Sequence, residues 1–264
     1  MKHVHRVYAI KYGHLERKAR TNFINPPGDH DADMPMDYFL WLVRCESGRT
    51  IVIDTGYNAC VARQRGRTML RHPADGLAQM GVNPQLVEDV VITHLHYDHA
   101  GNVEAFPKAR FWLQESEMQF TTGKYMCRDF FRLAYEREDV VAMVDALFDN
   151  RLHFVDGDAE IEPGVTLHHV GGHTAGLQVV RVQTEAGPVV VASDLFHYYA
   201  NFDHAQPFPI VYSPTQLLDS FERAKALVKD GGWLVPGHDP LVMSRFRAEP
   251  EDPEFTVRLW EPAL

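Results

Sequence analysis

Short apolar runs, separated by glycine, proline and polar residues, recur along the whole chain. Runs that consist mainly of valine, isoleucine, leucine and aromatic residues are typical of strands that are buried on both faces. The runs of this kind are residues 51–53, 90–92, 111–113, 165–167, 179–182, 189–191 and 233–235. We therefore expect a protein that is built around buried β-sheet.

Helical patterns lie between the predicted strands. The clearest begins at Ser213, which precedes a proline and stands three residues before Gln216, an arrangement typical of a capped helix N-terminus. Apolar residues then recur on one face until Gly231, and the segment 115–147 also has a largely helical pattern. Because strands and helices alternate and no repeat or charge run divides the sequence, we predict an α/β fold in a single domain that spans residues 1–264.

The charge of the chain limits its partners. Its formal net charge is −10 at pH 7 over 264 residues, whereas a protein that binds phosphate backbones needs a clustered excess of lysine and arginine. No segment approaches the roughly 18 apolar residues of a membrane span, and no apolar signal core follows the first residues. We therefore expect a cytoplasmic protein that has neither a nucleic-acid nor a membrane partner.

The cysteine content argues against thiol chemistry, whereas the histidine content is unusually high. Cys45, Cys60 and Cys127 lie far apart and form no C-x-x-C pair, so neither a disulfide framework nor a thiolate zinc site is indicated. Histidine is the unusual component of the composition, with 15 copies. The question is which of these imidazoles are brought together by the fold.

One short segment, His94-Leu-His96-Tyr-Asp98-His99, concentrates residue types that bind metals. Histidines two residues apart in an extended segment point the same way, so His94 and His96 can face one position. Asp98 and His99 follow at the turn and can point to a second position nearby. The segment can therefore contribute to the binding of two metal ions.

Four predicted strands end shortly before a candidate ligand. The pairs are 90–92 with His94, 165–167 with His173, 189–191 with Asp194 and 233–235 with His238. A sheet gathers the ends of its strands along one edge, where loops can carry functional side chains on a rigid support. Singly, such a histidine would more often be structural and such an aspartate a helix cap, but together with the dense segment they indicate a metal site.

These residues carry a family resemblance. The His94-x-His96-x-Asp98-His99 motif, followed by Gly-Gly-His173-Thr, Ala-Ser-Asp194 and Pro-Gly-His238-Asp, resembles the metallo-β-lactamase superfamily and, within it, the N-acyl homoserine lactonase group. The resemblance extends from about Tyr38 to His238 and includes Asp54 in Ile-Asp-Thr-Gly. It implies an αββα four-layer sandwich and a hydrolase with two divalent metal ions.

The resemblance also implies a role for each ligand and for nearby groups. One metal would be held by His94, His96 and His173, the other by Asp98, His99 and His238, with Asp194 bridging both and Asp54 in a supporting position. Imidazole and carboxylate ligands suit zinc, which we expect first, but also iron, cobalt or manganese.

The expected reaction is the opening of a small-molecule lactone, N-acyl homoserine lactone or a related ring. Two metal ions lower the pKa of a shared water molecule from 15.7 to roughly 7, and the resulting bridging hydroxide, next to Asp98, would attack the lactone carbonyl. Lactonases of this group commonly carry a tyrosine three residues after the bridging aspartate, where this chain has His197 followed by Tyr198. His197 is a candidate hydrogen-bond or proton donor, and Tyr198 is the alternative.

The sequence leaves open which residues form the pocket walls and which of several reactions the protein catalyses. Tyr97 is the best candidate for a wall, ahead of Phe120, Tyr125, Phe202 and Phe208, which are better explained as core residues. Aromatic walls would suit an acyl chain or a flat aromatic lactone. Alternatives are a thioester hydrolase similar to glyoxalase II and an oxidoreductase similar to persulfide dioxygenases with a single iron. The short tail after His238 disfavours the first, and the presence of both Asp98 and His238 disfavours the second. A homodimer is plausible through the segment around Phe130–Leu147.

Overall fold

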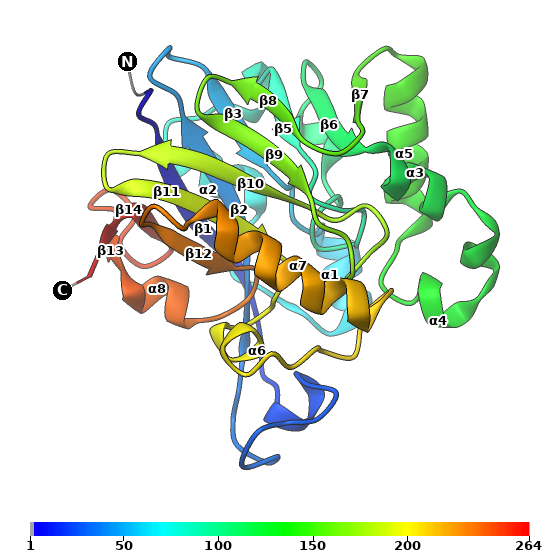
Figure 1. Cartoon of the computed structure of the whole chain (residues 1–264). Helices are drawn as coiled ribbons and strands as arrows, with labels where there is room; N and C mark the ends of the chain where they lie inside the picture. Colours follow the sequence, from blue (N-terminus) through cyan, green and yellow to red (C-terminus); the bar gives the residue numbers. More distant parts are fainter. Residues whose placement is uncertain (1–2, 264) are drawn as a thin grey trace.

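Two β-sheets packed face to face form the centre of the structure, a computed structural model that describes residues 3–263 (Figure 1). The first sheet contains, in spatial order, β13 (Phe246–Ala248), β14 (Thr256–Pro262), β1 (Arg6–Leu15), β2 (Met36–Arg44), β3 (Thr50–Ile53), β5 (Asp89–Val91), β6 (Arg110–Gln114) and β7 (Leu152–Val155), with β4 (Thr68–Met69) paired to β1. The second contains β12 (Trp233–Pro236), β11 (Gly187–Ser193), β10 (Gln178–Thr184), β9 (Val165–His169) and β8 (Ala159–Glu162).

Strand β2 shows why the apolar runs are continuous. Phe39 and Trp41 point into the core between the two sheets, which they share with Val180 of the second sheet. Leu40 and Leu42, on the opposite face of the same strand, belong to the core under the helices. Because alternate side chains of a strand face opposite ways and both sides are covered here, no position is left for polar alternation.

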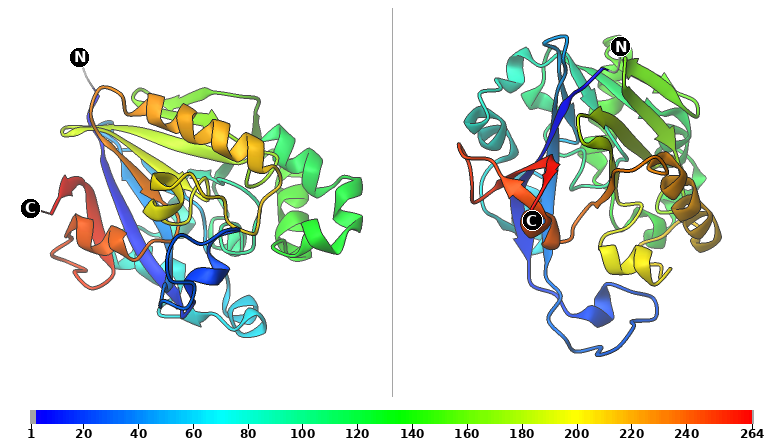
Figure 2. Two further views of the ribbon diagram at one scale, coloured as in Figure 1. Left: turned by 60° about the horizontal axis from the view of Figure 1, so that its bottom comes forward. Right: turned by 60° about the vertical axis from the view of Figure 1, so that its left-hand side comes forward.

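Helices cover the outer face of each sheet and complete the predicted αββα sandwich (Figure 2). On the first sheet lie α2 (Pro73–Gln79), α3 (Glu115–Thr121) and α5 (Arg137–Phe148), and on the second lies α7 (Pro214–Leu227). The remaining α-helices are α1 (Ala59–Arg65), α4 (Asp129–Arg132), α6 (Tyr199–Asp203) and α8 (Leu241–Arg245). None of the helices within residues 3–263 combines the length and apolar character that a membrane crossing requires.

The two helix predictions have different outcomes. Helix α7 begins as expected, because the Ser213 side chain accepts a hydrogen bond from the backbone N–H of Gln216. The segment 115–147 is interrupted at residues 122–128, which include a 3-10 turn, and again between α4 and α5, where the chain makes an extended contact with the dense histidine segment. There the backbone N–H of Tyr97 donates to the carbonyl of Ala134 at 2.9 Å. A tertiary contact thus replaces the local helical preference.

Strand direction brings the candidate ligands together. Strands β3, β5, β6 and β7 run parallel to one another in the first sheet. In the second sheet, β11 runs parallel to β12, and β9 has the same direction because both β9 and β11 are antiparallel to β10. The loops that follow these carboxyl ends meet between the two sheets, as the sequence predicts for the strands that precede His94, His173, Asp194 and His238.

Candidate metal centre

The loop after β5 is fixed by Asp54 at the end of β3. Asp54 accepts hydrogen bonds from the backbone N–H of Thr93 at 2.7 Å and from its hydroxyl at 2.8 Å. These contacts stabilise Asp54 at a φ of 62°, which is uncommon for a residue other than glycine. Further along, the N–H of His99 donates to the carbonyl of His96 at 3.0 Å. This tight turn brings Asp98 and His99 back toward the histidines that precede them.

Three histidines form a first group, which we call the histidine group: His94, His96 and His173. The His173 Nε2 atom lies 3.2 Å from His94 Nε2 and 2.9 Å from His96 Nδ1, and the latter two atoms are 3.0 Å apart. His173 Nδ1 donates to the backbone carbonyl of Ile210 at 2.7 Å, so its Nε2 lone pair faces the other rings. All three rings are buried, and their converging nitrogen atoms could hold a metal ion.

A carboxylate and two histidines form a second group, the mixed group: Asp98, His99 and His238. The Nε2 atoms of His99 and His238 lie 3.8 and 3.7 Å from different oxygens of Asp98. The opposite nitrogen of each ring is anchored, His99 Nδ1 by Asp54 Oδ2 at 2.7 Å and His238 Nδ1 by the carbonyl of Asp37 at 2.8 Å. Anchors of this kind fix the tautomer and the orientation of metal-binding histidines.

Asp194 lies between the two groups. Its Oδ1 atom is 3.3 Å from Nε2 of His99 in the mixed group, and its Oδ2 atom is 3.4 Å from Nε2 of His173 in the histidine group. The side chain is buried, and it follows β11 directly. The structure therefore brings all seven sequence-predicted ligands to one centre.

The two groups differ in their protonation. Burial is the main reason that the pKa of His94 lies well below its ordinary value, and it lowers the pKa of His173 to about 3. Burial acts in the same direction on His99, but the carboxylates of Asp194 and Asp98 outweigh it and raise the pKa of His99 well above the usual range. The histidine group is therefore neutral at pH 7, which is the form that binds metals.

The residues present fit divalent metal ions. The Nε2 atom of His99 and the Oδ1 atom of Asp194 are buried at the centre, and neither makes a hydrogen bond within residues 3–263. Buried polar atoms without partners are costly, and a cation between them would satisfy both. The available donors are nitrogen and carboxylate oxygen without a thiolate, which suits hard and borderline divalent metals.

Sequence reasoning did not find two supporting residues. The buried carboxylate of Glu117 accepts hydrogen bonds from the backbone N–H of Leu95 at 3.0 Å and of Gly176 at 2.8 Å, and so ties the loop of the dense segment to the loop of His173. Asp37, at the start of β2, supplies the carbonyl that anchors His238. Both contacts join distant segments, and no local motif marks either residue.

The two candidate catalytic residues after Asp194 lie in different places. His197 Nε2 is 3.0 Å from Asp194 Oδ2, and its ring stacks on Phe208 with 3.7 Å between ring centroids. The Tyr198 hydroxyl instead donates to the backbone carbonyl of Pro35 at 3.2 Å, and Tyr198 does not line the cavity at the centre. Burial lowers the pKa of His197 to about 4, so this ring is neutral at pH 7.

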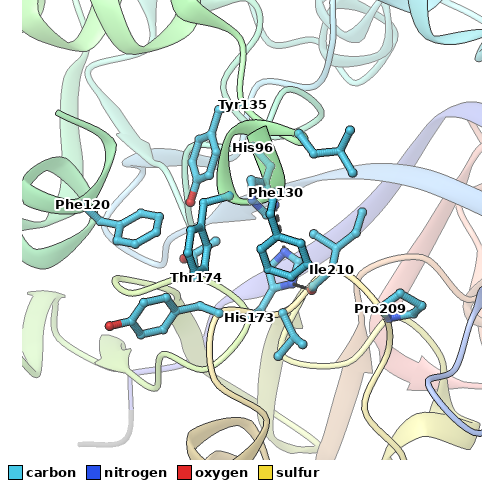
Figure 3. A pocket seen from close by; sticks show the side chains of 12 residues that line it. His96, Phe120, Phe130, Tyr135, His173, Thr174, Pro209 and Ile210 are labelled. Atoms are coloured by element: carbon cyan, nitrogen blue, oxygen red, sulfur yellow. Dashed lines mark hydrogen bonds between the residues drawn. The ribbon is translucent and has the colours of Figure 1, made fainter. Parts of the chain in front are cut away.

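Two cavities reach the centre, and His96 and His173 border both. The smaller has a volume of about 50 Å³ and apolar walls, among which Figure 3 shows Phe130, Tyr135 and Ile210 around the two histidines. The larger has a volume of about 170 Å³ and borders most of the candidate ligands. Its remaining walls include Tyr97, as expected, and the arginines Arg17, Arg65 and Arg67.

Two stacked sheets with a centre for divalent metals at their strand ends define a metal-dependent α/β protein. Residues 36–238 match the family model described as metallo-beta-lactamase superfamily. The chain belongs to this superfamily, which confirms the resemblance inferred from the motifs.

Individual relatives point in the same direction. The chain is 27% identical to N-acyl homoserine lactonase AttM of Azorhizobium caulinodans, over 93% of this chain and 97% of the relative. It is 30% identical to an N-acyl homoserine lactonase of a Bacillus species, over 78% and 82% of the two chains. A solved structure of an N-acyl homoserine lactone hydrolase, with N-hexanoyl-L-homoserine at its catalytic metal centre, matches with a TM-score of 0.77. At 23% identity over 96% of this chain and 100% of that chain, it demonstrates a shared fold.

Proposed function

We propose that this protein is a hydrolase that opens the ring of an N-acyl homoserine lactone or a related lactone, with two divalent ions, zinc first among them, at its centre. The proposal is supported by relatives that carry the name N-acyl homoserine lactonase. The observation that carries it is the position of Asp194, whose Oδ1 lies 3.3 Å from His99 of the mixed group and whose Oδ2 lies 3.4 Å from His173 of the histidine group and 3.3 Å from His238 of the mixed group. A cavity of about 170 Å³ lies directly beside this side chain.

In this proposal His94, His96 and His173 hold one ion, Asp98, His99 and His238 hold the other, and Asp194 contacts both. When bound, such ions acidify a water molecule and polarise the lactone carbonyl. Asp54 keeps His99 in the required tautomer through its 2.7 Å contact with Nδ1.

His197 is the candidate that assists the reaction. Its low pKa favours a neutral imidazole that donates a hydrogen bond over an imidazolium that delivers a proton at neutral pH. The stack on Phe208 and the contact with Asp194 hold the ring at the edge of the cavity. We assign no catalytic role to Tyr198, whose hydroxyl is occupied by a backbone carbonyl.

The test is metal analysis of the purified protein combined with a pH-indicator screen. The substrates are acyl-homoserine lactones of several chain lengths, simple γ- and δ-lactones and a glutathione thioester. We expect two metal equivalents and lactone hydrolysis, which His96→Ala removes and His204→Ala, at an exposed histidine outside the centre, preserves. Hydrolysis of the thioester without any lactone would contradict the proposal and favour the thioesterase alternative.

A homodimer stays a prediction. Phe130, Leu133 and Phe148 are exposed along the segment on which it rests, with exposed fractions of 68%, 65% and 82%. Light scattering of the purified protein would measure the assembly directly.

A further inference from the structure

We infer that the lactone opened by this enzyme carries a carboxylate, and that arginines in the wall of the larger cavity bind it. The inference rests on the proposed function and narrows its substrate class. It starts from a difference in charge: the chain as a whole carries a net charge of −10, yet three arginines border the cavity at the centre. The acidic residues of the same cavity, Asp98 and Asp194, are candidate metal ligands, so bound metal would neutralise them.

Arg67 is the best placed of the three arginines. It follows Gly66, which ends α1 in the left-handed conformation, and it is half-buried. Its Nε atom donates to the Tyr97 hydroxyl at 2.9 Å, and its Nη1 atom donates to the carbonyl of Arg65 at 2.8 Å. These contacts fix the plane of the guanidinium beside the motif residue Tyr97. Within residues 3–263 no ion pair engages Arg67, so its charge is available to a ligand.

The other two arginines differ in availability. Arg65 is already paired with Glu136, at 2.7 Å between Nη2 and the carboxylate, and it stacks on Tyr97 at 4.2 Å from the ring centroid. Arg17 comes from the long loop before β2 and bonds only to Thr21 and to the sulfur of Met36 in the described part of the chain. Arg17 and Arg67 therefore bring two unpaired positive charges to one cavity.

The smaller cavity offers an acyl chain apolar walls but less room than the larger cavity. Its volume of about 50 Å³ is less than a third of the roughly 170 Å³ of the larger cavity. The larger cavity, which borders five of the seven candidate ligands, is the one with the arginines. A substrate that fills it next to the metals must satisfy partly buried guanidinium groups.

A carboxylate satisfies them best. The guanidinium fork matches the two oxygens of a carboxylate, and hydrogen bonds between charged groups are roughly twice as strong as neutral ones. A neutral acyl chain would leave the remaining N–H groups of Arg67, including those of Nη2, facing apolar atoms, which carries a desolvation cost. The structure thus favours a lactone that carries an anionic group on its acyl side over one with a plain alkyl chain.

The experiment compares two lactones that differ only in charge. These are N-glutaryl-homoserine lactone and its terminal primary amide, assayed with the metal-loaded enzyme. We expect kcat/KM to be at least tenfold higher for the carboxylate, and the ratio of the two values to fall about tenfold in Arg67→Gln. Because both lactones share the ring and the metals, a general loss of activity in the variant leaves this ratio unchanged. Arg63→Gln, at an exposed arginine of α1, is the matched control and should keep the wild-type ratio.

The outcomes separate the two proposals. Hydrolysis of both lactones with a wild-type ratio at or below one, or a ratio that Arg67→Gln does not change, overturns the carboxylate inference and leaves the lactonase proposal intact. Hydrolysis of neither lactone by the metal-loaded enzyme overturns the lactonase proposal and the inference with it. A ratio that decreases as salt increases supports the inference, since ionic strength screens charge attraction in a solvent-accessible cavity.

Discussion

The histidine group and the mixed group have the same number of side chains but opposite electrostatics. His94, His96 and His173 contain no carboxylate, and their rings are neutral because burial lowers the pKa values. The mixed group contains Asp98, and the pKa values of both its histidines are raised because carboxylates outweigh burial. The two halves of one centre are thus prepared for a cation in different ways.

The supports of the two groups differ as well. His173 is anchored by a backbone carbonyl, which no side-chain substitution can remove, whereas His99 is anchored by the carboxylate of Asp54. A carboxylate adds negative charge near the metal position, and a carbonyl adds only a dipole. The mixed group should therefore hold a divalent ion more tightly. Its metal affinity should also be the one that a substitution at a supporting residue, Asp54, can lower.

The largest effect is expected at Asp194, because this side chain faces both groups. Asp194→Ala removes the only carboxylate shared by the two proposed metal positions. We expect less than one metal equivalent per chain and a loss of kcat/KM of at least about a thousandfold, because metal ions supply several kcal/mol of transition-state stabilisation. Asp203→Ala, at an exposed aspartate that ends α6, is the control. A variant that retains both metals would show that Asp194 does not bridge.

Removal of one ligand from each group tests the difference directly. His96→Ala should leave one metal in the mixed group, and Asp98→Ala should leave one in the histidine group, each with a loss of about a hundredfold or more in kcat/KM. The metal retained by His96→Ala should resist chelator better, because its site keeps the carboxylate of Asp98. Stoichiometry by elemental analysis and competition with a chelator measure both quantities. Equal chelator sensitivity of the two variants would contradict the electrostatic distinction.

A smaller effect is expected at the support of the mixed group. Asp54→Asn keeps the shape of the side chain but removes the charge behind His99, so metal affinity should fall by about 10- to 100-fold in one site only. A chelator titration of the variant should show one weakened and one unchanged metal. Two equally weakened sites would mean that Asp54 acts through the loop at Thr93, which it also holds, and not through His99.

Much of the centre could be predicted because its signals are local. The dense segment and the short apolar runs before His173, Asp194 and His238 each lie within a few residues of sequence. Two strands of the first sheet were not among the predicted runs: β1, in which the charged residue Lys11 interrupts the apolar pattern, and β2, although its residues 38–43 form a continuous apolar run.

The supports and the cavity walls could not be predicted, because they depend on contacts between distant segments. The carbonyl of Asp37 and the ring of His238 are 201 residues apart, and the Glu117 carboxylate meets Gly176 across 59 residues. The sequence also suggested aromatic walls, and Tyr97 and Phe120 do line cavities. The arginines of the larger cavity come from the end of α1, from the segment that follows it and from the loop before β2, and only the folded chain places them together.

The smallest effect concerns a carboxylate outside the centre, which serves as a reference for the mixed group. Asp139 in α5 is buried, one of its oxygens has no hydrogen bond within the described residues, and no imidazole compensates it. Burial, together with the negative charges of Glu136 and Glu104, raises the pKa of Asp139 to about 8, although Arg65 lies near enough to oppose the shift. At the centre the neighbouring histidines hold the pKa of buried Asp194 well below its ordinary value, whereas at Asp139 burial and neighbouring carboxylates outweigh the one nearby arginine.

The sign of the pH effect at Asp139 follows from linkage. Because the folded state holds this proton up to about pH 8 and the unfolded chain loses it near pH 4, the free energy of unfolding falls as the pH rises between these values. Asp139→Asn removes this contribution, so the variant should match wild type near pH 4 and exceed it by several kcal/mol at pH 8. Urea unfolding at several pH values measures the difference between the two proteins, in which any pH dependence of metal binding cancels. Asp145→Asn, at an exposed position of the same helix, should show no such pH-dependent gain, and a gain in both variants would trace the effect to helix charge and not to burial.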